Sequence, residues 1–270
     1  LEAACTAAEV GCNTFLLEKG NELGGLASLI SKIPAKNRLA DFPHYLMHRA
    51  EQLDNLYIFK NTEGAPENIR KFHPNIIVSS TGSAPLLPPI AGLKDRIDNE
   101  NHNIYSILGM ISHINDFPKD LEGKKVVVVG GGAVGLDVVE FFADRNADIS
   151  IVEMMDQIGR DLDPGSKNDT KTMMKKHNVH QLTKTALLEV KDSSFLVRGD
   201  GEPYELPFEY GFVCLGMRAQ GQLYQNLTEE FSSEDVEIMN IGDSQRARRI
   251  IDGTQEGRNI LTILEQKGYL

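Results

Sequence analysis

Three glycines with the spacing GxGxxG are the residues of this chain that point most directly to chemistry. Gly130, Gly132 and Gly135 directly follow the apolar run VVVV and directly precede a segment with helical periodicity. In that position the first glycine permits a tight turn, the second lets the backbone approach a pyrophosphate, and the third lets the helix pack closely on the strand. The pattern therefore predicts a dinucleotide-binding loop. The alternative is a glycine-rich turn between a strand and a helix that binds nothing.

Glu153 ends the next predicted strand, about twenty residues beyond the glycine loop. A carboxylate there can accept hydrogen bonds from both ribose hydroxyls of NAD, and it would repel a 2′-phosphate. No arginine follows in EMMDQ, and Arg160 comes only later, so the sequence favours NADH over NADPH. The first amides of the helix, those of Ala133 and Val134, would face the phosphates, where the helix dipole favours an anion. In the alternative without a ligand, Glu153 is an ordinary strand end.

The string FLLEKGNELGG repeats the second half of this arrangement. Its apolar stretch ends at Glu18, which is a place suited to an adenosine ribose. An apolar helical stripe over residues 1–8 comes before it, but no glycine loop precedes that helix. Because a parallel strand pair needs a strand before the connecting helix, we expect that one strand and its loop lie ahead of residue 1. Taken alone, Glu18 would indicate only a surface acid.

The remaining segments predict the elements that must position these residues. A strand over residues 124–129, the glycine loop, a helix and a strand ending at Glu153 follow one another in the sequence. One face of this helix is expected to cover a parallel sheet, and it carries Val134, Val138, Phe141 and Phe142. Short alternating runs between residues 182 and 209 predict a small antiparallel meander before the apolar strand GFVCLG. Further helices are predicted over residues 41–53 and 253–266, further strands over residues 13–18, 75–79 and 236–243, and a proline-rich linker over residues 85–92.

Composition excludes several classes of function. The 270 residues include 28 basic and 39 acidic ones, so the surface should repel nucleic acid and anionic lipid. No apolar run reaches the length of a membrane span, and the first residues do not resemble a signal peptide, so we expect a cytoplasmic protein without a membrane partner. The three cysteines form no CxxC pair, and no cluster has the spacing of metal ligands. We therefore expect no metal.

Over nearly its whole length the chain resembles the C-terminal half of the NADH:flavin oxidoreductases related to 2,4-dienoyl-CoA reductase and 2-enoate reductase. The strings that carry the resemblance are LEAACTAAEVGCNTFLLEKGNELGG, STGSAP, VVVVGGGAVGLDVVEFFA and IGDSQRARRIIDGTQEGRN. The resemblance implies an α/β fold of two Rossmann-like three-layer dinucleotide-binding domains. The FAD-type domain would be discontinuous and truncated at its N-terminus, with residues 1–90 plus 232–270, and the NAD(H)-binding domain would comprise residues 104–228.

The resemblance also implies which residues contact each cofactor. In the family the acid corresponding to Glu18 contacts the FAD ribose, and the late Gly-Asp motif holds the ribityl part of FAD. The expected NAD(H) contacts are Gly130, Gly132, Ala133, Val134, Gly135, Glu153 and Gly216. The expected FAD contacts are Glu18, Lys19, Gly24, Gly25, Leu26, Thr81, Gly82, Gly242 and Asp243.

The mechanism implied by the resemblance is hydride transfer from NADH to FAD, and it requires no catalytic acid or base from the chain. In the family the electrons continue to an N-terminal barrel, which carries FMN and an iron-sulfur cluster and reduces an enoate or an enoyl thioester. None of that barrel is in this sequence. We expect this fragment to be inactive alone, to hold FAD weakly or not at all, and to expose a sheet edge that could pair with another copy.

Two other functions use the same two domains. One is a nucleotide-binding module that keeps structural ADP in the FAD-like site and performs no redox chemistry, similar to trimethylamine dehydrogenase. The other is the small subunit of a glutamate synthase-like NAD(P)H reductase, although such proteins usually carry cysteine-rich cluster motifs. Neither the acceptor substrate nor the oligomeric state follows from the sequence.

Overall fold

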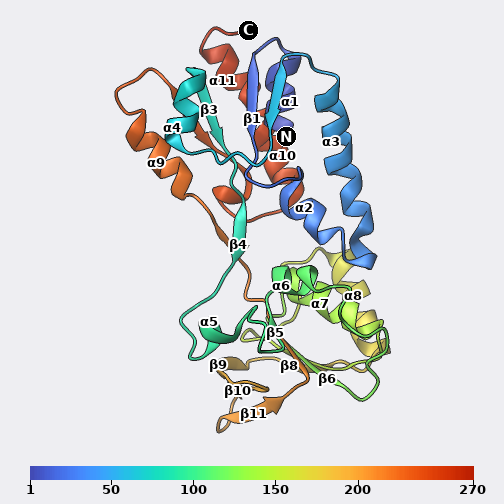
Figure 1. The fold of residues 1–270 in the computed structure, drawn as a ribbon. Helices are drawn as coiled ribbons and strands as arrows, with labels where there is room; N and C mark the ends of the chain where they lie inside the picture. The colour runs from blue at the N-terminus through green and yellow to red at the C-terminus, as the bar shows by residue number, and fades with distance from the viewer. The chain divides into compact units, whose positions relative to one another are not determined.

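The computed structural model describes residues 1–270, which form two compact units (Figure 1). The first unit comprises Leu1–Ser31, Lys36–Ala84 and Arg218–Leu270, and the second comprises Lys32–Ala35 and Pro85–Met217. The chain passes between the units at β4 (Ser83–Pro85) and β13 (Met217–Ala219), which pair with each other. Each unit contains a hydrophobic core of its own and a parallel pair or sheet of strands flanked by helices. The predicted α/β class is therefore confirmed.

A five-stranded parallel sheet forms the centre of the second unit. Its order is β5-β12-β6-β7-β8, and β6 is paired with both β7 and β12. Val126 to Val129 of β6 are at most 3% exposed, as expected for a strand that is covered on both faces. The strands are β5 (Ile104–Tyr105), β6 (Lys125–Val129), β7 (Asp148–Val152), β8 (His180–Leu182) and β12 (Tyr210–Val213).

Helix α7 (Ala133–Ala143) follows β6 and packs against this sheet. Val138, Phe141 and Phe142 are buried, and the ring of Phe142 lies 4.8 Å from that of Phe212 in β12. The predicted apolar helix face is thus confirmed at these three positions, whereas Val134 is only half-buried. The other helices of this unit are α5 (Leu93–Arg96), α6 (Ile107–Ser112) and α8 (Pro164–Lys176).

The predicted antiparallel meander is present in the second unit as a separate three-stranded sheet. Its strands are β9 (Ala186–Val190), β10 (Ser194–Arg198) and β11 (Tyr204–Pro207), in the order β11-β10-β9. Phe195 and Val197 of β10 are fully buried and belong to the same core as Val127 and Val129. The meander therefore shares its core with the parallel sheet.

The first unit contains two parallel strand pairs. Strand β1 (Thr14–Leu17) pairs with β2 (Leu56–Phe59), and β3 (Ile76–Ser79) pairs with β14 (Glu237–Asn240). Cys5 and Ala8 of α1 (Glu2–Glu9) and Ala50 of α3 (Asp41–Glu51) form one core with Leu56. The other helical elements of this unit are α2 (Gly25–Ile30), α4 (Pro66–Ile69), η2 (Arg70–Phe72), α9 (Gln222–Glu230), η3 (Gly242–Ser244), α10 (Ile250–Arg258) and α11 (Ile260–Gln266). The short helix η1 (Pro34–Ala40) begins in the second unit and ends in the first.

The C-terminal helix differs from the prediction. Instead of one helix over residues 253–266, α10 begins at Ile250 and α11 begins at Ile260, with Asn259 between them. The earlier start has a local cause, because Asp252 accepts hydrogen bonds from the backbone and side chain of Arg249 and so caps the first turn. None of the helices combines the length and the apolar character that crossing a bilayer requires.

Candidate functional site

The glycine loop, Glu153 and the segment after β12 meet at one edge of the second unit's sheet. Strands β6, β7 and β12 are parallel neighbours, so their carboxyl ends lie together. The amide of Gly130 donates to the carbonyl oxygen of Val152 at 2.8 Å, and the amide of Cys214 donates to that of Val129 at 2.7 Å. This edge is where open α/β sheets bind their ligands.

The three glycines of the loop differ in how much room each would leave for a side chain. Gly130 has φ +109°, and a Cβ atom there would stand 2.1 Å from the carbonyl oxygen of Cys214. A Cβ atom at Gly135 would stand 1.9 Å from the carbonyl oxygen of Gly130, so α7 approaches the loop more closely than a side chain would allow. A Cβ atom at Gly132 would meet nothing within 4 Å. The first and third glycines are thus required by packing, while the second borders open space.

The first turn of α7 presents its amides without a side-chain cap. Gly132 is the N-cap residue, and it makes no side-chain cap hydrogen bond to this end of the helix. Ala133 is exposed and Val134 is half-buried. Amides at a helix N-terminus without acceptors, together with the helix dipole, favour an anion such as a phosphate. The backbone here has the properties that a pyrophosphate site needs.

The carboxylate of Glu153 is held by backbone amides on two sides. Its Oε2 atom accepts a hydrogen bond from the amide of Gly131 at 2.6 Å, and its Oε1 atom accepts one from the amide of Met155 at 2.7 Å. Each carboxylate oxygen has a further lone pair for a ligand hydroxyl. Sequence reasoning did not single out Gly131, because the GxGxxG pattern leaves that position open.

Gly216 lies beyond the end of β12, at the same edge. It has φ +102°, and its carbonyl oxygen accepts a hydrogen bond from the amide of Leu86 at 2.9 Å. The neighbouring Cys214 is buried, and desolvation raises the pKa of its thiol to about 12. The thiol therefore stays protonated at neutral pH and is a poor nucleophile.

Glu18 and Lys19 lie at the end of β1 in the first unit. The Oε1 atom of Glu18 accepts a hydrogen bond from the amide of Gly20 at 2.7 Å, so this half-buried carboxylate is oriented by the turn that follows it. Lys19 is exposed and forms an ion pair of 2.8 Å with Glu63. Glu18 thus resembles Glu153 in ending a parallel strand with an oriented carboxylate.

Gly24, Gly25 and Leu26 form the start of α2. Gly24 is the N-cap residue with φ +98°, and Gly25 has φ +54°. A Cβ atom at Gly24 would stand 2.0 Å from the hydroxyl oxygen of Ser28. Leu26 is half-buried. The double glycine therefore serves the tight start of this short helix, and no hydrogen bond of the structure connects it to Glu18.

Thr81 and Gly82 are bonded to the segment that returns to the first unit. The hydroxyl of Thr81 donates to the carbonyl oxygen of Gln220 at 2.5 Å, and the amide of Gln220 donates to the carbonyl oxygen of Gly82 at 2.9 Å. The hydroxyl of the adjacent Ser83 donates to the Oδ2 atom of Asp243 at 3.0 Å. Ser83, which the sequence did not indicate, thereby brings the Thr81–Gly82 turn and the Gly-Asp motif together.

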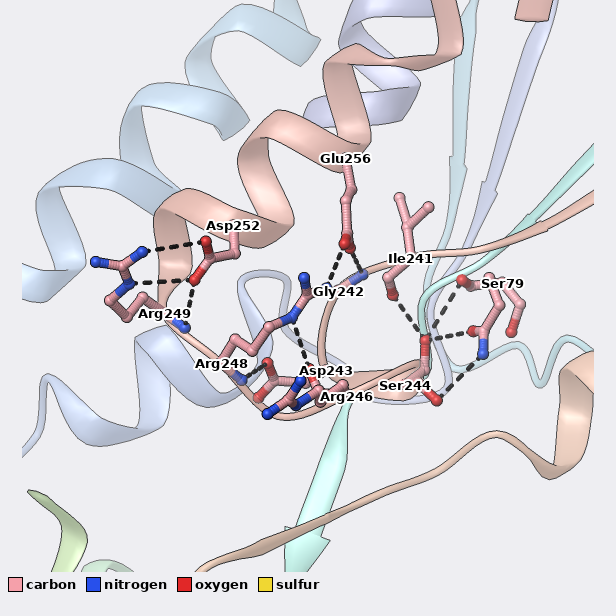
Figure 2. Close-up of polar contacts among 11 residues, drawn as sticks. Ser79, Ile241, Gly242, Asp243, Ser244, Arg246, Arg248, Arg249, Asp252 and Glu256 are labelled. Atoms are coloured by element: carbon pink, nitrogen blue, oxygen red, sulfur yellow. Dashed lines mark hydrogen bonds and ion pairs between the residues drawn. The ribbon is translucent and has the colours of Figure 1, made fainter. Parts of the chain in front are cut away.

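The Gly-Asp motif after β14 is fixed by Glu256 of α10 and by Arg248, which precedes that helix (Figure 2). The amide of Gly242 donates to the Oε2 atom of Glu256 at 2.6 Å, and Glu256 also pairs with Arg248. The Oδ1 atom of Asp243 accepts a hydrogen bond from the amide of Arg248 at 3.0 Å. Asp243 is half-buried and keeps lone pairs that could accept hydrogen bonds from a polyol.

The predicted contacts thus form two groups, one in each unit. The second unit brings the glycine loop, Glu153 and Gly216 to one sheet edge. The first unit joins Thr81, Gly82 and Asp243 through Ser83 and Gln220, while Glu18 and Lys19 stand at the end of β1. Among residues 1–270 no group of three or more His, Cys, Asp or Glu side chains could hold a metal ion.

Residues 48–239 match the family described as pyridine nucleotide-disulphide oxidoreductase. The chain is 26% identical over 258 residues to an NADH oxidase of Thermoanaerobacter brockii and 25% identical over 295 residues to a metal reductase of Desulforamulus reducens. These alignments cover 95% and 96% of this chain but 38% and 41% of the relatives.

A similar fold occurs in a solved structure of 2-naphthoyl-CoA reductase, with a TM-score of 0.81 and 22% sequence identity. That match covers 96% of this chain and 37% of the solved one. The chain therefore spans about two fifths of the length of these similar proteins. Each of them contains further polypeptide that this chain does not match.

Proposed function

Because the chain belongs to the pyridine nucleotide-disulphide oxidoreductase family, we propose that it is the electron-transfer portion of a flavin-dependent NADH oxidoreductase. In this proposal the second unit binds NADH and the first unit binds FAD. The family supports a redox enzyme that uses a pyridine nucleotide and FAD, and the NADH oxidase of Thermoanaerobacter brockii is similar over nearly the whole chain.

The observation that carries the proposal is the geometry around Glu153. Its carboxylate is oriented by the amides of Gly131 and Met155, next to a helix start without a side-chain cap and with open space at Gly132. This arrangement fits a dinucleotide, with the pyrophosphate at Gly132 and Ala133 and the adenosine ribose at Glu153. The negative charge of Glu153 disfavours a 2′-phosphate, which supports NADH over NADPH.

The residues of the first unit fit a flavin nucleotide. Asp243 is held by the hydroxyl of Ser83 and the amide of Arg248, so its remaining lone pairs have a fixed direction toward ligand hydroxyls. Glu18 ends a parallel strand with an oriented carboxylate, as a ribose contact requires. The flavin itself supplies the hydride-accepting chemistry, and the task of the chain is to bind and orient both cofactors.

We further propose that the electrons pass to another domain of the parent protein, a barrel with FMN and an iron-sulfur cluster that reduces an enoate or an enoyl thioester. Two findings support this step. The chain spans about two fifths of its relatives, which leaves room for such a domain. The solved neighbour is named for the reduction of an aromatic acyl-CoA thioester, and a relative of Clostridium sporogenes is named for the reduction of cinnamate, which is an enoate.

Calorimetric titration of the purified chain with NADH, NADPH and FAD, after an absorbance spectrum for bound flavin, tests the proposal. We expect NADH to bind more tightly than NADPH, and we expect Glu153→Ala or Gly132→Val to weaken NADH binding at least tenfold, because each removes a contact or fills the space for the pyrophosphate. A folded protein that binds no nicotinamide nucleotide would contradict the assignment of the second unit. Tight binding of ADP without any binding of flavin would instead support a structural nucleotide site.

A further inference from the structure

Gly131 is the loop residue that the GxGxxG pattern leaves unspecified, yet the structure engages both of its backbone groups. Its amide donates to the Oε2 atom of Glu153 at 2.6 Å, and its carbonyl oxygen accepts a hydrogen bond from the amide of Gly159 at 2.7 Å. Gly131 is buried and lies between the strand end at Glu153 and the segment that follows it. The residue is thus part of the support of the carboxylate.

The space around Gly131 is filled by Glu153 itself. A Cβ atom at position 131 would stand 2.9 Å from the Oε2 atom of Glu153, 3.1 Å from its Cβ atom, and 3.1 Å from the Cγ1 atom of Ile158. The shortest of these contacts involves the end of a flexible side chain. A methyl group at position 131 would therefore move the carboxylate before it moved the backbone.

We propose that Gly131 is a positioning residue that sets the preference of this site for NADH over NADPH. It does so by leaving the carboxylate of Glu153 room to lie against the loop, where the amides of Gly131 and Met155 hold it. The inference rests on the proposed NADH site of the second unit. A carboxylate fixed in this way accepts hydrogen bonds from the ribose hydroxyls and repels a 2′-phosphate, and a displaced carboxylate does both less well.

The test compares Gly131→Ala with a matched substitution one residue further on. Gly132→Ala adds the same methyl group to the same loop, but there the methyl group meets nothing within 4 Å. We expect Gly131→Ala to weaken NADH binding about tenfold and to leave NADPH binding nearly unchanged. The dissociation constant of NADPH divided by that of NADH, which we call the NADPH to NADH ratio, should therefore fall about tenfold. Gly132→Ala borders the pyrophosphate, which both nucleotides share, and should weaken both equally.

A double-mutant cycle shows whether Gly131 acts through Glu153. In a Glu153→Ala background the added methyl group at position 131 has no carboxylate to displace. Gly131→Ala should therefore not change the ratio of the NADPH to the NADH dissociation constant in that background. Glu153→Asp is a second test that leaves the glycine loop unsubstituted. Aspartate keeps the charge, but its shorter side chain draws the carboxylate away from the amide of Gly131, so the ratio of the NADPH to the NADH dissociation constant should again fall.

The outcomes separate this inference from the proposed function. If the unsubstituted chain binds neither NADH nor NADPH, the proposed function and the inference both fail. If the unsubstituted chain prefers NADH and folded Gly131→Ala keeps the same ratio, or loses both nucleotides equally, only the inference is overturned. If Gly131→Ala does not fold, an unchanged ratio in Glu153→Asp overturns the inference.

Discussion

At the scale of single residues, the sheet edge at the glycine loop of the second unit is shaped by the close approach of backbone groups. The carbonyl oxygen of Cys214 occupies the position that a side chain at Gly130 would need, and the carbonyl oxygen of Gly130 does the same at Gly135. These contacts explain why two of the three glycines are needed for packing alone. Gly132 differs from them, because a Cβ atom there would meet no atom of the chain within 4 Å.

Cys214 gives a prediction at this scale. Burial raises the pKa of its thiol to about 12, and the thiolate is the reactive form. We expect a thiol reagent at pH 8 to modify the partly exposed Cys12 first and Cys214 only after unfolding. Mass spectrometry of peptides from native and denatured samples checks the order. Rapid modification of Cys214 in the native protein would indicate that this edge opens, contrary to the buried arrangement.

The site was largely foreseeable from the sequence where local rules decide the geometry. The roles of Gly130 and Gly135 follow from the order of strand, turn and helix, because that order fixes where the backbone comes close. The sequence could not indicate Gly131 or Ser83. Their importance depends on contacts with Glu153 and Asp243, which lie 22 and 160 residues away in the chain.

At the scale of elements, helix α1 is tied to α3 and α10 by ion pairs around Glu2. One oxygen of this buried carboxylate accepts hydrogen bonds from Arg49 at 3.0 Å and Arg258 at 2.9 Å. Burial alone would raise the pKa of Glu2, but the hydrogen bonds from Arg258 and Arg49 outweigh it and lower that pKa. The carboxylate therefore remains charged in the folded protein at neutral pH. Arg49 also pairs with Glu9 at 2.8 Å.

Replacing Arg49 should therefore weaken the first unit strongly. Arg49 is 14% exposed and Glu2 is 6% exposed, so Arg49→Leu leaves a buried charge with less compensation. We expect the free energy of unfolding to fall by about 3 kcal/mol, measured by urea denaturation. Arg38→Leu is the control, because the side chains of Arg38 and Asp41 form an ion pair that is 89% and 60% exposed. Loss of that pair should lower the free energy of unfolding by less than about 1 kcal/mol. Equal losses would show that burial does not strengthen the Glu2 network.

Element prediction succeeded where the apolar pattern is continuous and failed where a helix buries too few residues to give such a pattern. The strand at Val126–Val129 and helix α7 are fixed by an unbroken apolar pattern. Helices α8 and α9 were not predicted, since α8 carries only one buried residue and α9 also only one. In α8 the cap at Asp163, which accepts hydrogen bonds from the amides of Gly165 and Ser166, was the signal available.

At the scale of the whole molecule, the two units have separate cores and should respond separately to a ligand of one of them. A ligand present at one hundred times its dissociation constant stabilises its binding unit by about 2.7 kcal/mol. We expect saturating NADH to slow hydrogen exchange in β6, β7 and β12 while exchange in β3 and β14 stays unchanged, as measured by mass spectrometry. Equal protection in both units would mean that they unfold as one cooperative body.

Because the first unit is discontinuous, it cannot be completed during synthesis until the whole second unit has been made. Strand β3 is complete by Ser79, but its partner β14 begins only at Glu237, after the whole second unit. On a ribosome the second unit can thus emerge and fold while β3 still lacks its neighbour, since domains generally fold as units during synthesis. More than 150 residues must be translated after Ser79 before β14 can pair with β3, which takes roughly ten to thirty seconds at usual elongation rates. During that interval the nascent chain is a natural client for chaperones.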